Sequence, residues 1–346
     1  MLSLMYRSTC SRLTLPSLSA PNTICAVRSE YSLLGIVYSR MVGTNIFRKI
    51  FLHHPKYAVV DDRALVTTEN WKPAGLGGRS SRGWGVVVRG NETANALAGL
   101  FRADAGWRDS TDWSAFRAGR TFEIEGPANG SYPTRFEPEN FSVDGVRVLA
   151  APDNAEDALV GLLDNATESI RIVQASVGSR RQPFVRAALR AAERGVDVRV
   201  LLSGAWYAEE DNRALAAWLN RRANRTDASL HAKVAEPEGR FEKIHAKGVV
   251  VDGDRAVVSS VNWNNNSARQ NREVGLVLDG EAVAGYYADV FDADWNGSGG
   301  GEGGSGPGLG LGDWADDQPL PVGVAVAALG VVTLAVLVAR RIRFVD

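Results

Sequence analysis

The stretch that decides the fold is IHAKGVVVDGDRAVVSSVNW, Ile244 to Trp263. It contains an apolar run, VVV, a turn through Gly253, and a second apolar run, AVVSSV, that ends at an Asn-Trp pair. Two apolar runs of strand length separated by turn residues predict a β-hairpin. A histidine and a lysine lie at its start, so one end of an otherwise buried element carries titratable groups.

A second copy of this pattern occurs earlier, in HHPKYAVVDDRALVTTENW, His53 to Trp71. When His54 is aligned with His245, both copies continue through a turn, a returning strand, a further strand and a helical segment that ends in tryptophan. The histidine-to-tryptophan separations are 53 and 50 residues. Repetition on this scale predicts two similar α/β lobes in one chain.

The two copies differ in what precedes them. Before the second copy, apolar strand-like runs alternate with helical periodicity, which predicts a mostly parallel sheet with helices on its faces. Before His54 lie only 53 residues, Ser-rich, Arg-bearing and acid-poor, which match nothing in the second copy. They indicate a targeting segment or an altered start, so the first lobe is expected to be partial. The expected strands are 146–149, 170–175 and 196–202, and the expected helices are 155–166, 183–194 and 212–222.

Each hairpin is expected to gather the same polar groups at one end. Side chains two residues apart on a strand point to the same side, so each histidine shares a face with a lysine. The returning strand adds a hydroxyl and a carboxamide nearby. The pairs are His54 with Lys56, Thr68 with Asn70, His245 with Lys247, and Ser260 with Asn262. Asp61 and Asp252 lie at an odd offset from the histidines and are expected to anchor the turns.

Neither hairpin is an active site alone, but two facing each other would be. A phosphodiester needs a nucleophile, an acid for the leaving oxygen, and positive charge around the non-bridging oxygens. One imidazole can attack phosphorus and the other can transfer the proton. This scheme requires no metal or other cofactor. The sequence also has no metal-ligand pattern, with four histidines and only two cysteines, Cys10 and Cys25.

The pattern His-x-Lys-x4-Asp, present twice, resembles the phospholipase D superfamily. The resemblance implies a pseudo-dimeric α/β sandwich with its site between the lobes, His54 as nucleophile and His245 as acid and base. The candidate catalytic residues are then His54, Lys56, Asp61, His245, Lys247 and Asp252. The candidate phosphate-binding or supporting residues are Asn70, Ser260, Asn262, Asn271 and Glu273.

One carboxylate of the family pattern occurs in only one copy. The resemblance implies an Asn-x-Glu sequence about ten residues after the hairpin asparagine, and Asn271-Arg272-Glu273 fits it. Glu273 would orient a catalytic imidazole, across the lobe interface. The aligned residues of the first copy are Ser81-Arg82-Gly83. We therefore expect one histidine to be without its usual orienting carboxylate.

The C-terminal end predicts a membrane anchor. A Gly-rich stretch is followed by Leu320 to Ala339, 20 residues without a charge, and then by three arginines. Such a run is long enough to cross a hydrocarbon core of about 30 Å as a helix. The arginines favour a cytoplasmic tail and an extracellular body on a single-pass protein of the cell membrane. The expected domains are 1–50 unmatched, 51–145 first lobe, 146–295 second lobe, 296–318 linker and 319–340 transmembrane helix.

Three functions remain open at this stage. The first is metal-independent hydrolysis or transfer of phospholipid, of the phospholipase D or cardiolipin synthase kind. The second is a nuclease of the same chemistry, although a net charge of −1 gives no basic footprint for nucleic acid. The third is a surface protein with impaired catalysis, suggested by the partial first lobe.

Overall fold

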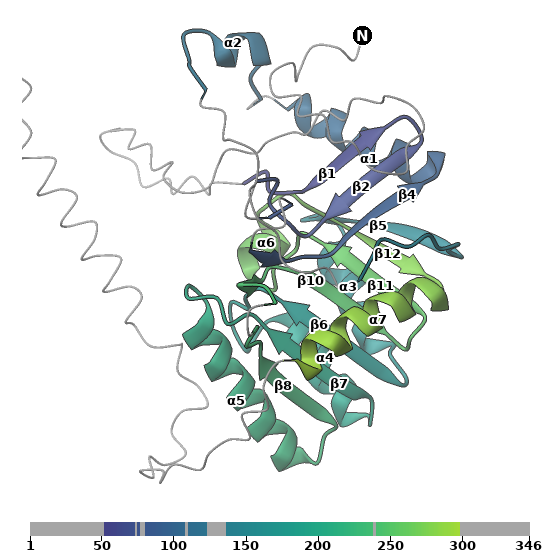
Figure 1. The fold of residues 1–346 in the computed structure, drawn as a ribbon, viewed down its shortest axis with the longest axis vertical. Coiled ribbons are helices and arrows are strands. Elements are labelled where there is room, and N and C mark those ends of the chain that lie inside the picture. The colour runs from purple at the N-terminus through teal and green to yellow at the C-terminus, as the bar shows by residue number, and fades with distance from the viewer. Residues whose placement is uncertain are drawn as a thin grey trace, which may run out of the picture. The chain divides into compact units, whose positions relative to one another are not determined.

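The computed structural model describes residues 52–72, 75–76, 80–107, 110–122, 136–237 and 240–297 (Figure 1). By contacts the chain divides into two units, 1–300 and 301–346, and every described residue belongs to the first. The expected linker, from residue 298 onward, and the expected transmembrane helix at 319–340 lie outside the described residues. Within the described ranges, no helix combines the length and the apolar character needed to cross a membrane.

The second lobe is built on a seven-stranded sheet with strand order β5-β12-β11-β10-β6-β7-β8. Its strands are β5 (Gly145–Ala151), β6 (Ser169–Gln174), β7 (Asp197–Leu202), β8 (Leu230–Val234), β10 (Lys247–Val251), β11 (Arg255–Ser259) and β12 (Glu273–Asp279). Only β6, β7 and β8 are parallel, and the other neighbours pair antiparallel. The expectation of a mostly parallel sheet is therefore wrong. Strands joined by a tight turn must run antiparallel, and helical crossovers make only the β6–β7–β8 part parallel.

Helices cover both faces of this sheet. Val249 and Val251 of β10 pack on one face, in a core shared with four helices, while Val250 packs on the other face. The run VVV is apolar because both faces of this central strand are buried. Figure 1 shows α7 crossing the face opposite α3 and α4. The helices are α3 (Ala155–Asp164), α4 (Pro183–Glu193), α5 (Glu209–Thr226), α6 (Asn265–Arg269) and α7 (Glu281–Asn296).

The first lobe contributes a three-stranded antiparallel sheet, β1-β2-β4, to the described residues. Its side chains, including Val66, Trp84 and Leu97, belong to the same buried cluster as α7 and the second face of the large sheet. A short parallel pair, β3 with β9, links the two lobes. The elements are β1 (Tyr57–Val60), β2 (Arg63–Thr67), β3 (Ser81–Arg82), β4 (Gly85–Arg89), α1 (Asn91–Ala105), α2 (Trp113–Arg117) and β9 (Lys243–Ile244).

Candidate active site

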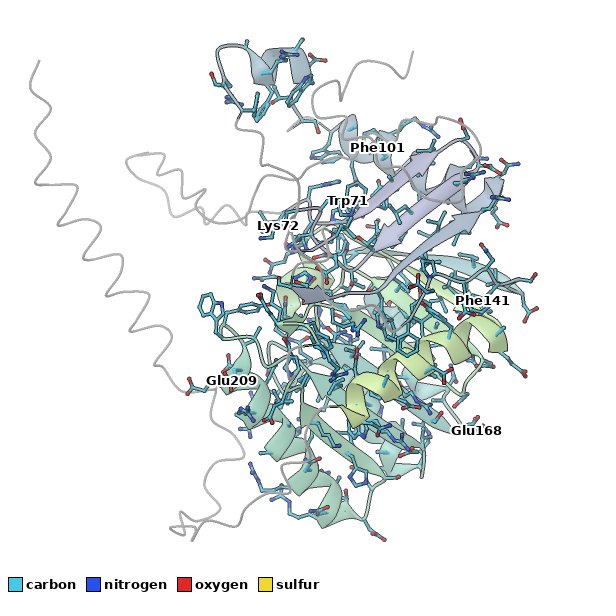
Figure 2. The ribbon with its side chains drawn as sticks, viewed as in Figure 1. Trp71, Lys72, Phe101, Phe141, Glu168 and Glu209 are labelled. Atoms are coloured by element: carbon cyan, nitrogen blue, oxygen red, sulfur yellow. The ribbon has the colours of Figure 1, made fainter. Side chains whose placement is uncertain are left out.

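The two candidate histidines are held by equivalent backbone hydrogen bonds, each donated to a residue of the other lobe. The N–H of His54 donates to the carbonyl of Arg272 at 3.0 Å, and the N–H of His245 donates to the carbonyl of Arg82 at 2.9 Å. Each histidine therefore starts a hairpin in its own lobe and is fixed by the other lobe. Trp71 and Lys72 follow the first hairpin at the end where His54 enters it (Figure 2).

His54 is backed by a buried carboxylate from the second lobe. Its Nδ1 lies 3.0 Å from both carboxylate oxygens of Glu273, whose side chain is fully buried. Ser260 Oγ, Ser267 Oγ and Asn271 Nδ2 donate to the same carboxylate at 2.5, 2.6 and 3.2 Å. Burial works against ionisation, but the hydrogen bond and charge of His54 outweigh it and lower the pKa of Glu273. Glu273 is thus a fixed anion that leaves Nε2 of His54 for a ligand.

His245 has a different set of neighbours. Its Nδ1 lies 3.1 Å from the Thr68 carbonyl, 3.4 Å from a carboxylate oxygen of Glu69 and 3.1 Å from Lys247 Nζ. Two oxygen acceptors at Nδ1 favour the tautomer protonated there, with the free lone pair on Nε2. Burial and then the charge of Lys247 lower the pKa of His245 to about 4. His245 is therefore neutral at pH 7.

The expectation that one histidine has no carboxylate is wrong. Gly83 leaves no side chain at the aligned position, but Glu69 of the first lobe faces His245 instead. Glu69 directly precedes the hairpin asparagine in TTENW, where the second copy has valine in SSVNW. This glutamate, at a position where the second copy has valine, is the feature of the sequence that could have indicated a carboxylate beside His245.

The two motif lysines are buried beside the histidines. Lys56 is 5% exposed and Lys247 is 1% exposed. Each Nζ donates to the backbone carbonyl of its own histidine. Burial lowers the pKa of Lys56 to about 8 and that of Lys247 to about 7, against the opposing charges of Glu69 and Glu273. Two amino groups held out of water are available to bind an anionic group, as cations at pH below these pKa values.

Ser260 and Thr68, the hydroxyl residues directly after the returning strands, make hydrogen bonds that fix the backbone around the site. Ser260 Oγ accepts the N–H of Val274 while it donates to Glu273, and Thr68 Oγ1 accepts the N–H of Trp84. Asn271 also supports the site through the hydrogen bond that its Nδ2 donates to Glu273. Ser267, which the sequence analysis missed, lies in α6 rather than in a hairpin, and its Oγ donates to Glu273. Asn70 and Asn262 follow these hydroxyl residues in the sequence, are partly exposed, and stay predicted phosphate ligands.

The motif aspartates lie at the other end of the hairpins. Asp61 and Asp252 are turn residues with φ of 54° and 51°, and the whole of β10 separates Asp252 from His245. Asp252 accepts the backbone N–H groups of Thr167, Glu168 and Ser169. We therefore do not retain either aspartate as a catalytic candidate, since a strand of five residues spans about 16 Å.

Replacing Asp252 with asparagine is expected to cost about 1–3 kcal/mol of stability, because one oxygen that accepts N–H groups becomes a donor. Asparagine tolerates positive φ, so backbone strain does not contribute. Asp61→Asn is the matched control and is expected to change stability by under about 0.5 kcal/mol. Thermal unfolding of both variants measures the difference. Equal unfolding temperatures would show that the contacts of Asp252 do not anchor the turn.

Comparison with known proteins finds a family model that matches most of the second lobe. The family model described as "Cardiolipin synthase, PLD-like domain" matches residues 159–295. Cardiolipin synthase A of Citrobacter koseri is 32% identical over 109 residues, which are 32% of this chain and 21% of that protein. The chain thus spans about a fifth of the length of that curated relative.

Two solved structures show lower similarity. Nuc from Salmonella typhimurium, a phospholipase D family member, is 23% identical and covers 45% of this chain and 96% of its own, with a TM-score of 0.38. The phosphatidylserine synthase of Haemophilus influenzae is 14% identical, with coverages of 71% and 61% and a TM-score of 0.49. The family match contains the second His-x-Lys-x4-Asp motif and Glu273. Over residues 159–295, the chain is therefore similar to the PLD-like domain of the phospholipase D superfamily.

Proposed function

We propose that this chain cleaves or transfers phosphodiesters through a covalent phosphohistidine. The observation that carries the proposal is the reciprocal arrangement of two imidazoles, each fixed by the opposite lobe and each beside a carboxylate of that lobe. In both rings Nδ1 faces the protein, so Nε2 is left for the substrate. The buried ammonium groups of Lys56 and Lys247 would bind the non-bridging oxygens.

The contacts favour His245 as the nucleophile. Attack requires a neutral imidazole, and burial together with Lys247 disfavours the charged form of this ring. Nδ1 of His54 lies 3.0 Å from both oxygens of Glu273, which would hold the ring with Nε2 directed toward the leaving oxygen, as a proton donor requires. This assignment reverses the one that the family resemblance implies.

The proposed reaction has two steps. In the first, Nε2 of His245 forms a bond to phosphorus, the bond from phosphorus to the leaving oxygen breaks, and Nε2–H of His54 protonates that oxygen. In the second, water or an alcohol attacks the same phosphorus and gives its proton to His54, and the P–N bond breaks. Hydrolysis and transfer differ only in the second nucleophile.

A phospholipid is the substrate we propose. The matched family model and the curated relatives carry the name cardiolipin synthase. Trp206 is 87% exposed, and the pKa of its neighbour Tyr207 is raised by burial and by the charge of Glu69, so this aromatic pair lies near the site. Exposed Trp and Tyr side chains suit the boundary between lipid headgroups and acyl chains. The expected helix at 319–340 would hold the site close to that boundary.

The test is an assay of the purified full-length chain in the presence of a chelator. Phosphatidylglycerol vesicles and a single-stranded oligonucleotide are offered separately, and products are followed by ³¹P NMR and mass spectrometry. We expect phosphatidic acid or cardiolipin from the vesicles, and none with His245→Ala. Cleavage of the oligonucleotide alone would make the protein a nuclease of the same chemistry. Turnover of neither would overturn the proposal and favour a non-catalytic protein.

The pH dependence of kcat/KM is expected to be bell-shaped. It rises as pH passes about 4, where His245 becomes neutral, and falls through about 7 to 8, where Lys247 and Lys56 lose their protons. A soluble short-chain phosphodiester gives the cleanest profile. A kcat/KM that already falls tenfold per pH unit above pH 4 would show that His245 acts as the acid instead.

A further inference from the structure

We propose that Glu69 is the positioning carboxylate for His245, and that it has taken over this role from position 83, where the first lobe has glycine. The inference rests on the proposed function in naming the reaction that Glu69 supports. Its structural basis is a comparison of the two lobes.

The register of the strands fixes which residues of the lobes correspond. In both lobes the last residue of the returning strand pairs with a glycine of the next strand: Thr67 with Gly85, and Ser259 with Gly275. Two residues before these glycines stand Gly83 in the first lobe and Glu273 in the second. Position 83 is therefore the structural equivalent of the orienting glutamate.

The same frame makes Glu69 equivalent to Val261. In both lobes the residue before this position holds the next strand through its hydroxyl and its backbone N–H. These contacts are Trp84 N–H to Thr68 Oγ1, Val274 N–H to Ser260 Oγ, Thr68 N–H to the Trp84 carbonyl, and Ser260 N–H to the Val274 carbonyl. At these two positions the second lobe has Val261, at the end of the hairpin, and Glu273. At the equivalent positions the first lobe has Glu69 and Gly83.

The glutamate side chain fills the space that the glycine leaves. A Cβ added at Gly83 would lie 2.2 Å from Glu69 Cγ and 2.4 Å from Glu69 Oε1. Real side chains essentially never approach so closely, so a larger residue at position 83 and the observed Glu69 exclude each other. The two positions therefore form one site for a single carboxylate, which can be supplied from either strand.

The contacts of Glu69 are those of a group directed at His245. Glu69 is 5% exposed, and Oε2 lies 3.4 Å from His245 Nδ1. Its other oxygen, Oε1, is buried and has no hydrogen-bond partner among the described residues. The negative charge also opposes the effect of Lys247 on the imidazole. Together with the Thr68 carbonyl, 3.1 Å from the same Nδ1, Glu69 would keep the proton on Nδ1 and the attacking lone pair on Nε2.

The decisive experiment exchanges the carboxylate between the two positions. Glu69→Val is expected to lower kcat about 100-fold with KM changed less than about threefold, as for other residues that orient a catalytic imidazole. Adding Gly83→Glu to that variant reproduces the second-lobe arrangement and is expected to restore kcat to within about tenfold of wild type. A structural role alone predicts no such rescue. Matching far-UV circular dichroism and unfolding temperatures keep the comparison among folded proteins.

A readout without turnover separates this inference from the proposed function. The ¹⁵N chemical shifts of His245, in histidine-labelled full-length protein and assigned with His245→Ala, report its tautomer. We expect the Nδ1–H form to dominate in wild type and in the double variant. In Glu69→Val we expect a smaller excess of this form, because the Thr68 carbonyl is the one oxygen acceptor left beside Nδ1. If wild type cleaves no diester but these shifts hold, the proposed function fails and the positioning role stands. If Glu69→Val keeps both the wild-type kcat and the wild-type tautomer, Glu69 is not the positioning residue.

Discussion

His245→Ala is expected to reduce turnover of phosphodiesters by about 10⁴-fold or more, as loss of the nucleophile does in covalent catalysis. Without Nε2 at this position there is no neutral imidazole to attack the phosphorus atom. An activated leaving group should not help, because no P–N bond can form. Turnover of a p-nitrophenyl phosphodiester is therefore expected to fall as far as that of an alkyl diester.

His231→Ala is the matched control for this variant. His231 lies exposed on β8, two residues before a lysine, and resembles the motif in sequence only. We expect wild-type kcat and KM from it. If His245→Ala retained more than about a tenth of wild-type turnover while folded, the attack would have to come from another residue.

His54→Ala is expected to lower turnover of an alkyl phosphodiester by about 10²–10⁴-fold, the usual contribution of a general acid and base. A leaving group that departs without a proton should rescue the first step selectively. With a p-nitrophenyl diester we predict a burst of one equivalent of p-nitrophenol, followed by a stall. The second step stalls because no base remains to take the proton from water.

The stalled species identifies the attacking ring. A phosphoryl–imidazole bond is labile in acid, so the reaction is quenched with denaturant at alkaline pH and the peptides are mapped by mass spectrometry. We expect the phosphoryl group on His245 in His54→Ala. The mirror result, a burst in His245→Ala with the label on His54, would restore the assignment implied by the family resemblance.

Much of this fold can be predicted from residue patterns alone. The apolar runs of the two hairpins predict β10, β11, β1 and β2, and the helical periodicity before the second hairpin predicts α3, α4 and α5. Strand direction was predicted less well. Alternating strands and helices indicate parallel pairing, but β12 inserts between β5 and β11, and this order depends on long-range contacts.

The candidate site was predictable where spacing along a strand places the side chains. His54, Lys56, His245 and Lys247 follow from a period of two. Glu69 was missed because a search for a carboxylate at an aligned position finds only Gly83. The proposed exchange between the two positions is visible only in three dimensions, where the side chain of Glu69 occupies the space that a Cβ at Gly83 would need. Local pattern cannot reveal such a substitution, since the two residues are neighbours in space and not in sequence.

The central claim is that the two imidazoles act on one phosphorus atom. The most direct test is a crystal structure of the full-length chain with orthovanadate, which mimics the five-coordinate phosphoryl group in transfer. The account predicts vanadium bonded to Nε2 of His245, with Nε2 of His54 within hydrogen-bond distance of the opposite apical oxygen. Vanadate bound away from the lobe junction, or in contact with one histidine while the other lies out of reach, would contradict it.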